Sequence, residues 1–170
     1  MNNNLRKEDI EALITRNKNS ICKLAYCYVK NTDDVQDIYQ SVFEKYLKYT
    51  PSFESEEHEK AWFIRTTINT CKNVCSSAWH KKVFAFQHDD LQQQIEAHQS
   101  LCTTESNPMT EKLLSSIMKL PDKYRVVIHL YYYEDYPTKE IARLIGSSVA
   151  TVKTRLCRAR DMLEQSLKSE

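Results

Sequence analysis

The chain contains a single glycine, Gly146, and only four prolines among its 170 residues. β-Sheets are connected by tight turns, and tight turns draw on glycine and proline. A chain so poor in both residues favours long helices joined by polar segments. Apolar residues make up 41% of the sequence, which is enough to form buried cores. We therefore expect an all-α protein.

Three helices are predicted in the first half of the chain. Apolar residues recur with a helical period over residues 8–30. A second helix follows, with Asp33 or Asp34 as its N-cap. A third runs from about Glu56 to beyond Trp79.

A polar segment separates these helices from the rest of the chain. Residues 89–108 hold four acidic residues and no basic one, and helical periodicity resumes near Thr110. The sequence therefore predicts two small helical domains, 1–88 and 109–170, joined by an acidic, flexible linker at 89–108.

The sequence contains neither a membrane span nor a catalytic motif. No apolar run is long enough to cross a bilayer, and residues 1–6 lack the apolar core of a signal peptide. We expect a cytoplasmic protein with six reduced cysteines. Cys71, Cys75 and His80 could be metal ligands, but apolar neighbours favour small buried side chains for the two cysteines. Without a Gly-rich phosphate loop or a paired nucleophile and base, we expect no enzyme, no metal and no cofactor.

A helix-turn-helix is predicted near the C-terminus. Thr138 can cap a short helix that ends at Gly146, where a helix C-terminus favours a residue that tolerates positive φ. The hydroxyls of Ser147 and Ser148 can cap the next helix. A helix, a short glycine-containing turn and a second helix form the helix-turn-helix pattern, and the second helix is the recognition helix.

The recognition helix has a buried and an exposed side. Val152, Leu156, Ala159 and Leu163 share one face at helical spacing. The remaining positions carry short polar or basic side chains, namely Thr151, Lys153, Thr154, Arg155, Cys157, Arg158 and Arg160. Short side chains and an arginine suit base edges in a major groove, and flanking cations suit phosphates. Arg158 is the best candidate for a base contact, although an ordinary helical hairpin with a solvated basic face is the alternative.

The third predicted helix has an exposed face without acidic residues. This face carries an aromatic ring, amides and cations, namely Trp62, Arg65, Asn69, Lys72, Asn73 and His80. Aromatic rings stack on unpaired bases, amides read base edges and cations hold the backbone, so the face suits single-stranded DNA. Trp62 has an equally plausible role as a half-buried packing residue.

The second predicted helix has the opposite charge. Residues 33–59 hold eight acidic residues and two basic ones, whereas residues 60–88 hold five basic residues and no acidic one. Asp34, Asp37 and Gln40 can bind a basic protein surface, and a solvated acidic face is the alternative.

Three stretches resemble the extracytoplasmic-function (ECF) group of bacterial sigma factors. They are DDVQDIYQSVFEKYL (Asp33–Leu47), EEHEKAWFIRTTINTCKN (Glu56–Asn73) and LPDKYRVVIHLYYYEDYPTKEIARLIGSSVATVKTRLCRARDML (Leu120–Leu163). The resemblance implies a promoter-recognition subunit that binds core RNA polymerase and promoter DNA, opens the DNA and is restrained by an anti-sigma factor. It implies no small-molecule substrate.

The resemblance also implies roles for individual residues. Asp37 and Gln40 match positions that bind the β′ clamp, and the second domain of the family engages the β flap. The positions that match the surface for opening and reading the minus-ten element are Trp62, Arg65, Asn69, Lys72 and Asn73. In the domain that reads the minus-thirty-five element, Thr154, Cys157 and Arg158 match base-reading positions, and Lys139, Arg143, Lys153 and Arg155 match phosphate-binding ones. Cys157 departs from the family by placing a weak hydrogen-bonding group at such a position.

Two other functions are compatible with parts of the sequence. A transcription regulator that acts without polymerase would use the same helix-turn-helix, but it would need a dimerisation or ligand-binding domain at its N-terminus. A metal-dependent hydrolase would need a better ligand spacing than Cys71, Cys75 and His80 provide.

Overall fold

The computed structural model describes residues 7–77 and 108–169. Within these two ranges every regular element is helical and no strand occurs, as the glycine and proline content predicts. The described residues form two compact units, 7–77 and 108–169. The predicted linker lies outside them except for Pro108, at which a helix begins.

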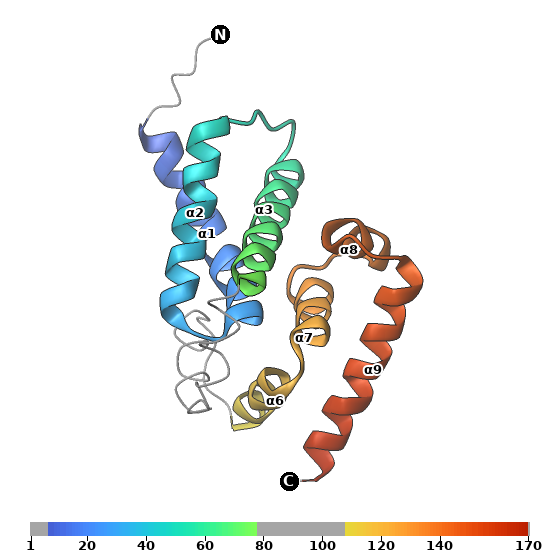
Figure 1. Ribbon diagram of the computed structural model, residues 1–170. Coiled ribbons are helices and arrows are strands. Elements are labelled where there is room, and N and C mark those ends of the chain that lie inside the picture. The colour runs from blue at the N-terminus through green and yellow to red at the C-terminus, as the bar shows by residue number, and fades with distance from the viewer. Residues whose placement is uncertain (1–6, 78–107, 170) are drawn as a thin grey trace. The chain divides into compact units, whose positions relative to one another are not determined.

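The first unit is a bundle of three helices (Figure 1). They are α1 (Lys7–Val29), α2 (Thr32–Tyr49) and α3 (Glu56–Ser76). Each helix packs against the other two. Its core contains Leu24 of α1, Ile38 and Val42 of α2, and Ile64 and Ile68 of α3, all almost completely buried. Burying an aliphatic side chain of this size stabilises a fold by about 1.5–3 kcal/mol, so these residues fix the position of α3.

The cap of α2 differs from the sequence prediction. Asn31, not Asp33 or Asp34, is the N-cap, and its Oδ1 accepts a hydrogen bond of 2.8 Å from the backbone N–H of Asp34. Its Nδ2 donates in return to Oδ2 of Asp34 at 2.7 Å. The Asn31 side chain thus bonds both the backbone and the side chain of Asp34, so the helix begins earlier than an aspartate cap would allow.

α3 ends at Ser76, before the point predicted from periodicity. The hydroxyl of Ser76 donates to the carbonyl of Asn73, and that of Ser77 donates to the carbonyl of Val74. Serine hydroxyls that bond nearby backbone groups compete with helix propagation, and Ser77 adopts an extended conformation. Trp79 lies outside the described residues.

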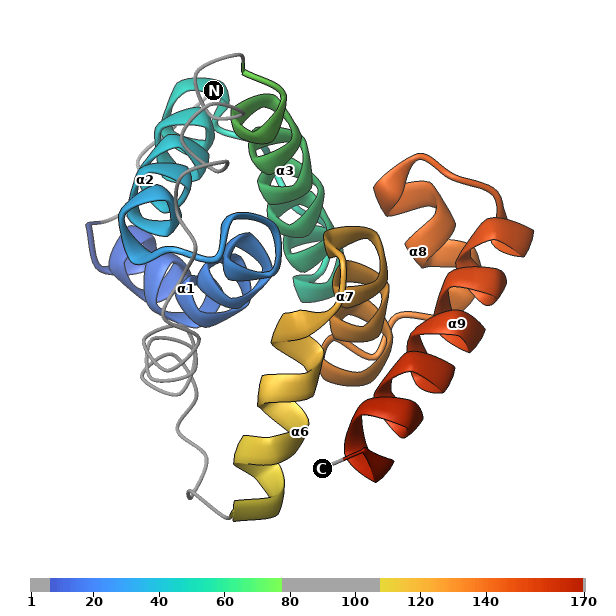
Figure 2. The ribbon, with the colours of Figure 1, turned by 60° about the horizontal axis from the view of Figure 1, so that its bottom comes forward.

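The second unit is built around one long helix (Figures 1 and 2). Its elements are α6 (Pro108–Lys119), α7 (Asp122–Ile128), the π-helical turn η1 (His129–Tyr133), α8 (Thr138–Ile145) and α9 (Val149–Lys168). α9 packs against α6, α7 and α8. Val127, Leu130, Ile141 and Val152 are almost completely buried in the core.

The helix that begins at Asp122 changes its winding at His129. The N–H of Glu134 bonds the carbonyl of His129, five residues back, at 3.2 Å. The wider turn brings the Glu134 carboxylate to 3.3 Å from Nε2 of His129, and both side chains are buried. The imidazole also stacks on Tyr133. The sequence prediction contained no signal for this turn, because hydrophobic periodicity does not distinguish one π turn from an α turn.

α8 begins without the predicted threonine cap. Pro137 occupies the N-cap position, and no side chain caps the helix. The proline ring fixes φ and places Pro137 in an extended conformation directly before the helix, so Thr138 becomes the first helical residue.

Candidate nucleic-acid interface

The turn between α8 and α9 has the predicted helix-turn-helix geometry. Gly146 has a φ of 68° and its N–H bonds the carbonyl of Ala142. A Cβ at Gly146 would meet no heavy atom within 4 Å, so the backbone conformation rather than space favours glycine. Ser148 caps α9 as predicted, because its Oγ accepts from the N–H of Thr151 at 3.1 Å.

The buried side of α9 agrees with the predicted one. Val152, Leu156 and Ala159 are buried, and Leu163 is half-buried. The candidate DNA-binding residues Lys153, Thr154, Cys157, Arg158 and Arg160 are exposed, while Thr151 and Arg155 are partly buried. The rotation of the helix therefore presents most of the candidate residues to solvent.

The exposed residues of α9 have different hydrogen-bonding states. The hydroxyl of Thr154 donates to the carbonyl of Ala150 at 2.9 Å. Arg158 lies beside Tyr124 of α7. A hydrogen bond between the Arg158 guanidinium and the Tyr124 phenol lowers the pKa of that phenol. Nζ of Lys123 lies 5.0 Å from the centre of the Tyr124 ring. Two cations and a phenol thus lie together next to the recognition helix.

Arg160 is engaged by two tyrosines of η1. Its Nε donates to the hydroxyl of Tyr132 at 2.9 Å. Its guanidinium carbon lies 5.7 Å from the ring centres of both Tyr131 and Tyr132. Sequence reasoning placed Arg160 beside the phosphates and missed these rings, because the tyrosines are 28 and 29 residues away in the chain.

α8 carries the other two basic candidates. Lys139 and Arg143 are exposed. Nη1 of Arg143 bonds Oε1 of Glu140 at 2.7 Å, one turn away on the same helix. Exposed pairs of this kind are weak, so Arg143 can exchange Glu140 for a phosphate at little cost.

Trp62 of α3 is half-buried within a cluster of aromatic rings. Its ring centre lies 5.0 Å from that of Phe63, 6.0 Å from that of Phe53 and 6.2 Å from that of Tyr46. The packing interpretation of Trp62 is therefore confirmed for part of the ring, and the interpretation as a surface for unpaired bases stays a prediction that concerns the accessible rest. Arg65, Asn69, Lys72 and Asn73 are exposed on the same helix, and His80 lies outside the described residues.

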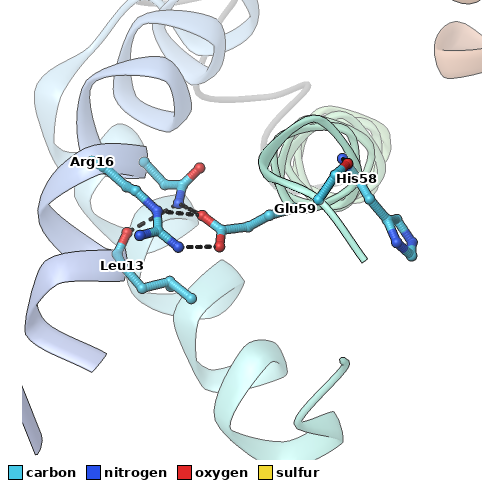
Figure 3. Close-up of polar contacts among 6 residues, drawn as sticks. Leu13, Arg16, His58 and Glu59 are labelled. Carbon is cyan, nitrogen blue, oxygen red and sulfur yellow. Dashed lines mark hydrogen bonds and ion pairs between the residues drawn. The ribbon is translucent and has the colours of Figure 1, made fainter. Parts of the chain in front are cut away.

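Glu59 holds the start of α3 against α1, as Figure 3 shows. Its carboxylate is buried and accepts two hydrogen bonds from the Arg16 guanidinium, one of them 2.7 Å long from Nε. Nδ2 of Asn17 donates to the same carboxylate at 2.6 Å. His58, the preceding residue, points away from this site.

The three-residue contact keeps Glu59 ionised. Burial acts to raise the pKa of the Glu59 carboxyl, but the hydrogen bonds from Arg16 and Asn17 outweigh it and hold that pKa below its usual value. Sequence reasoning counted Glu59 only as one of the acidic residues of 33–59 and assigned it no contact. The missed signal was its position one turn before the aromatic residues of α3, on the side that packs against α1.

The three candidate residues of α2 differ in their contacts. Asp34 is half-buried and bonds Asn31, so it also has a structural role. Asp37 is exposed. Gln40 is exposed and donates to Oε1 of Glu44 at 3.0 Å. Asp37 and Gln40, one helical turn apart, can therefore be contacted by a partner without disturbing the fold.

The cysteines of α3 are packing residues. Cys71 is buried, and burial raises the pKa of its thiol well above the usual value. Cys75 is half-buried. Within residues 7–77 and 108–169, no three histidine, cysteine or acidic side chains gather as metal ligands would. None of the helices in these ranges has the length and apolar character that crossing a membrane requires.

Two family models match the chain. The model of sigma-70 region 2 matches residues 13–81, which include α2 and α3. The model of sigma-70 region 4 matches residues 110–163, which include the helix-turn-helix. The matched ranges therefore contain both candidate DNA-binding surfaces.

Individual proteins match over most of the chain. The RNA polymerase sigma factor SigV of Bacillus subtilis is 29% identical over 169 residues, which are 97% of each chain. SigZ of the same organism is 30% identical over 139 residues, which are 82% of this chain and 76% of SigZ. The fold is similar to that of the sigma factor RpoE from Bartonella quintana in complex with the anti-sigma factor NepR. That likeness has a TM-score of 0.62 and 16% identity, and it covers 95% of this chain and 96% of RpoE.

Proposed function

Because the chain belongs to the ECF group of the sigma-70 family of RNA polymerase sigma factors, we propose that its two units read two promoter elements. A sigma factor directs RNA polymerase to promoters and supports initiation. We assign the minus-ten element to the domain at 1–88 and the minus-thirty-five element to the domain at 109–170, with the linker at 89–108 between them. The chain itself then carries out no chemistry, and it acts in the cytoplasm with its polymerase.

The exposed face of α9 carries this proposal. This face exposes Thr154, Cys157 and Arg158. They follow the helix start, which Ser148 caps. Arg158 is the candidate for bidentate recognition of guanine. Lys153 and Arg155 on α9, and Lys139 and Arg143 on α8, are the candidates for phosphate contacts.

α3 is the proposed surface for unpaired DNA. Trp62 offers a partly accessible ring held from behind by Phe53 and Phe63, so a base could stack on it without reordering the ring. Arg65, Asn69, Lys72 and Asn73 add cations and amides on the exposed part of the helix. His80 belongs to the same proposal.

Protein partners are assigned to other surfaces. Asp37 and Gln40, with Asp34 beside them, are proposed to bind the β′ clamp of core polymerase. The second unit has a groove of about 470 Å³ with an apolar lining that includes Leu113, Tyr132 and Leu163, which suits the β flap. We also propose restraint by an anti-sigma factor, because RpoE of Bartonella quintana was solved with one.

Run-off transcription tests the proposal. Purified protein and bacterial core polymerase are incubated with a fragmented genomic library from the source organism. We expect transcripts that depend on the protein and share two upstream elements. DNA binding without such transcripts from an active core would overturn the assignment of the two promoter elements and favour a regulator that acts without polymerase.

A further inference from the structure

Three exposed side chains occupy the base-reading part of α9. Thr154, Cys157 and Arg158 lie within about one helical turn of one another. Arg158 carries hydrogen-bond donors for the two acceptors of guanine. The other two are short, and they decide what the helix accepts beside that guanine.

Neither short side chain is an effective donor toward DNA. The hydroxyl proton of Thr154 is used in the bond to the carbonyl of Ala150. Cys157 offers a thiol, which is a weak donor and behaves as a small apolar group. A base that presents acceptors to these residues would lose hydrogen bonds to water and gain poor ones in return. Toward a base the pair offers apolar surface, the methyl group of Thr154 and the sulfur of Cys157, beside the remaining acceptor of the Thr154 hydroxyl.

Only one base edge carries an apolar group that matches this surface. In the major groove, thymine alone presents a methyl group, at C5, and threonine methyl groups are known partners for it. We propose that Thr154 and Cys157 read a thymine through its C5-methyl group, beside the guanine contacted by Arg158. This inference rests on the proposed role of α9 at the minus-thirty-five element and adds the chemistry of the base that is read there.

Deoxyuridine isolates the methyl group. Full-length protein and core polymerase first select binding sites from promoter duplexes randomised in the upstream element. Each thymine of the selected element is then replaced in turn by deoxyuridine, which removes only the methyl group. We expect one position near the selected guanine to lose affinity by about fourfold, the factor that one buried methyl group implies.

Two conservative variants connect the effect to the side chains. T154S removes the methyl group and keeps the hydroxyl, and C157S keeps the size and adds a donor. In each variant the thymine-to-deoxyuridine ratio should fall toward one, while the guanine preference is kept. K153A is the matched control: overall affinity should fall, and the ratio should stay near fourfold.

The outcomes separate this inference from the function on which it rests. A selected element with guanine, but with no position sensitive to deoxyuridine, overturns the methyl contact and leaves the minus-thirty-five role intact. A ratio unchanged in both T154S and C157S also overturns it. If no upstream element is selected, the role of α9 and the methyl contact are both wrong.

Discussion

Basic side chains on α9 have different surroundings, and these decide what each can bind. Lys153 is exposed, Arg158 lies beside Tyr124, and Arg160 is held by Tyr131 and Tyr132. A guanidinium that already contacts two rings and a hydroxyl has less to gain from a phosphate. We therefore expect fewer cations of α9 to contact DNA than a count along the helix gives.

Arg158 and Lys153 should affect binding in different ways. R158A removes the donors for one base, so we expect promoter selectivity to fall by roughly 1–3 kcal/mol. K153A should cause a smaller loss that is similar for all sequences, because a phosphate contact carries no sequence information. Competition binding of the polymerase complex to matched and mismatched promoters measures both. Equal losses on every sequence for both variants would contradict base reading by Arg158.

Arg160 should contribute little to the salt dependence of promoter binding. Each phosphate contact changes the slope of log K against log salt by about 0.9. We expect K153A to reduce the slope by about that amount and R160Q to leave it nearly unchanged, because Arg160 is engaged by tyrosines. A filter-binding titration over salt concentration measures both slopes. If R160Q changed the slope as much as K153A does, Arg160 would also contact a phosphate.

Glu59 should stabilise the first unit in a way that depends on pH. E59Q loses charge-assisted hydrogen bonds from Arg16 and Asn17, so unfolding free energy at pH 7 should fall by roughly 1–3 kcal/mol. Because the folded state lowers the pKa of Glu59, its contribution is present above the ordinary carboxyl pKa. That contribution disappears as pH falls through the lower folded value. Denaturant unfolding of wild type and E59Q should therefore converge in acid.

The exposed Glu54 provides the control for that measurement. E54Q should unfold like wild type at pH 7. A difference in unfolding free energy between wild type and E59Q that persists unchanged in acid would mean that Glu59 stabilises the unit through its shape rather than its charge.

At the scale of elements, sequence patterns predicted faces better than boundaries. The buried face of α9 and its Ser148 cap agree with prediction, because packing and capping depend on residues close in sequence. The caps of α2 and α8, the end of α3 and the winding of η1 differ. At Asn31 and Ser77 the difference comes from hydrogen bonds between side chains and neighbouring backbone groups, which periodicity does not register. At α8 it comes from the fixed φ of Pro137. The contacts of Glu59 and Arg160 join distant parts of the chain and were missed for that reason.

The turn before α9 should tolerate asparagine better than alanine. Gly146 adopts a left-handed conformation with open space around its Cβ position. G146A should reduce stability by roughly 1–2 kcal/mol, and G146N by less, because asparagine enters this region more readily. Thermal unfolding of the full chain compares the three proteins. Equal stability of all three would mean that the turn can change conformation freely.

At the scale of the whole molecule, the proposed polymerase-binding and DNA-binding surfaces lie on different helices of the first unit. The exposed part of α2 carries Asp37 and Gln40, and the exposed part of α3 carries Arg65 and Asn69. α3 is anchored by Glu59, which is remote in sequence from the acidic candidates of α2. The two binding functions should therefore be separable by substitution.

Substitutions on the exposed face of α2 are expected to weaken binding to core polymerase. D37A combined with Q40A should weaken binding to core polymerase by roughly 1–2 kcal/mol while leaving the unfolding curve unchanged. D34A is the contrasting variant, because Asp34 bonds Asn31 at the start of α2 and its loss should also reduce stability. Affinity is measured with labelled protein and purified core. If the double variant bound core polymerase with wild-type affinity, Asp37 and Gln40 would not be part of the polymerase interface.

The π-helical turn η1 makes the direction of the chain between α7 and α8 depend on the number of residues in that segment. One turn of η1 closes over five residues, whereas an α-helical turn closes over four. Removing one residue from His129–Tyr133 would let the segment wind as an ordinary helix. Each residue of an α-helix rotates the chain after it by about 100°. A deletion of one residue in η1 would thus change the direction in which the chain leaves η1 toward α8, without altering any residue of α9.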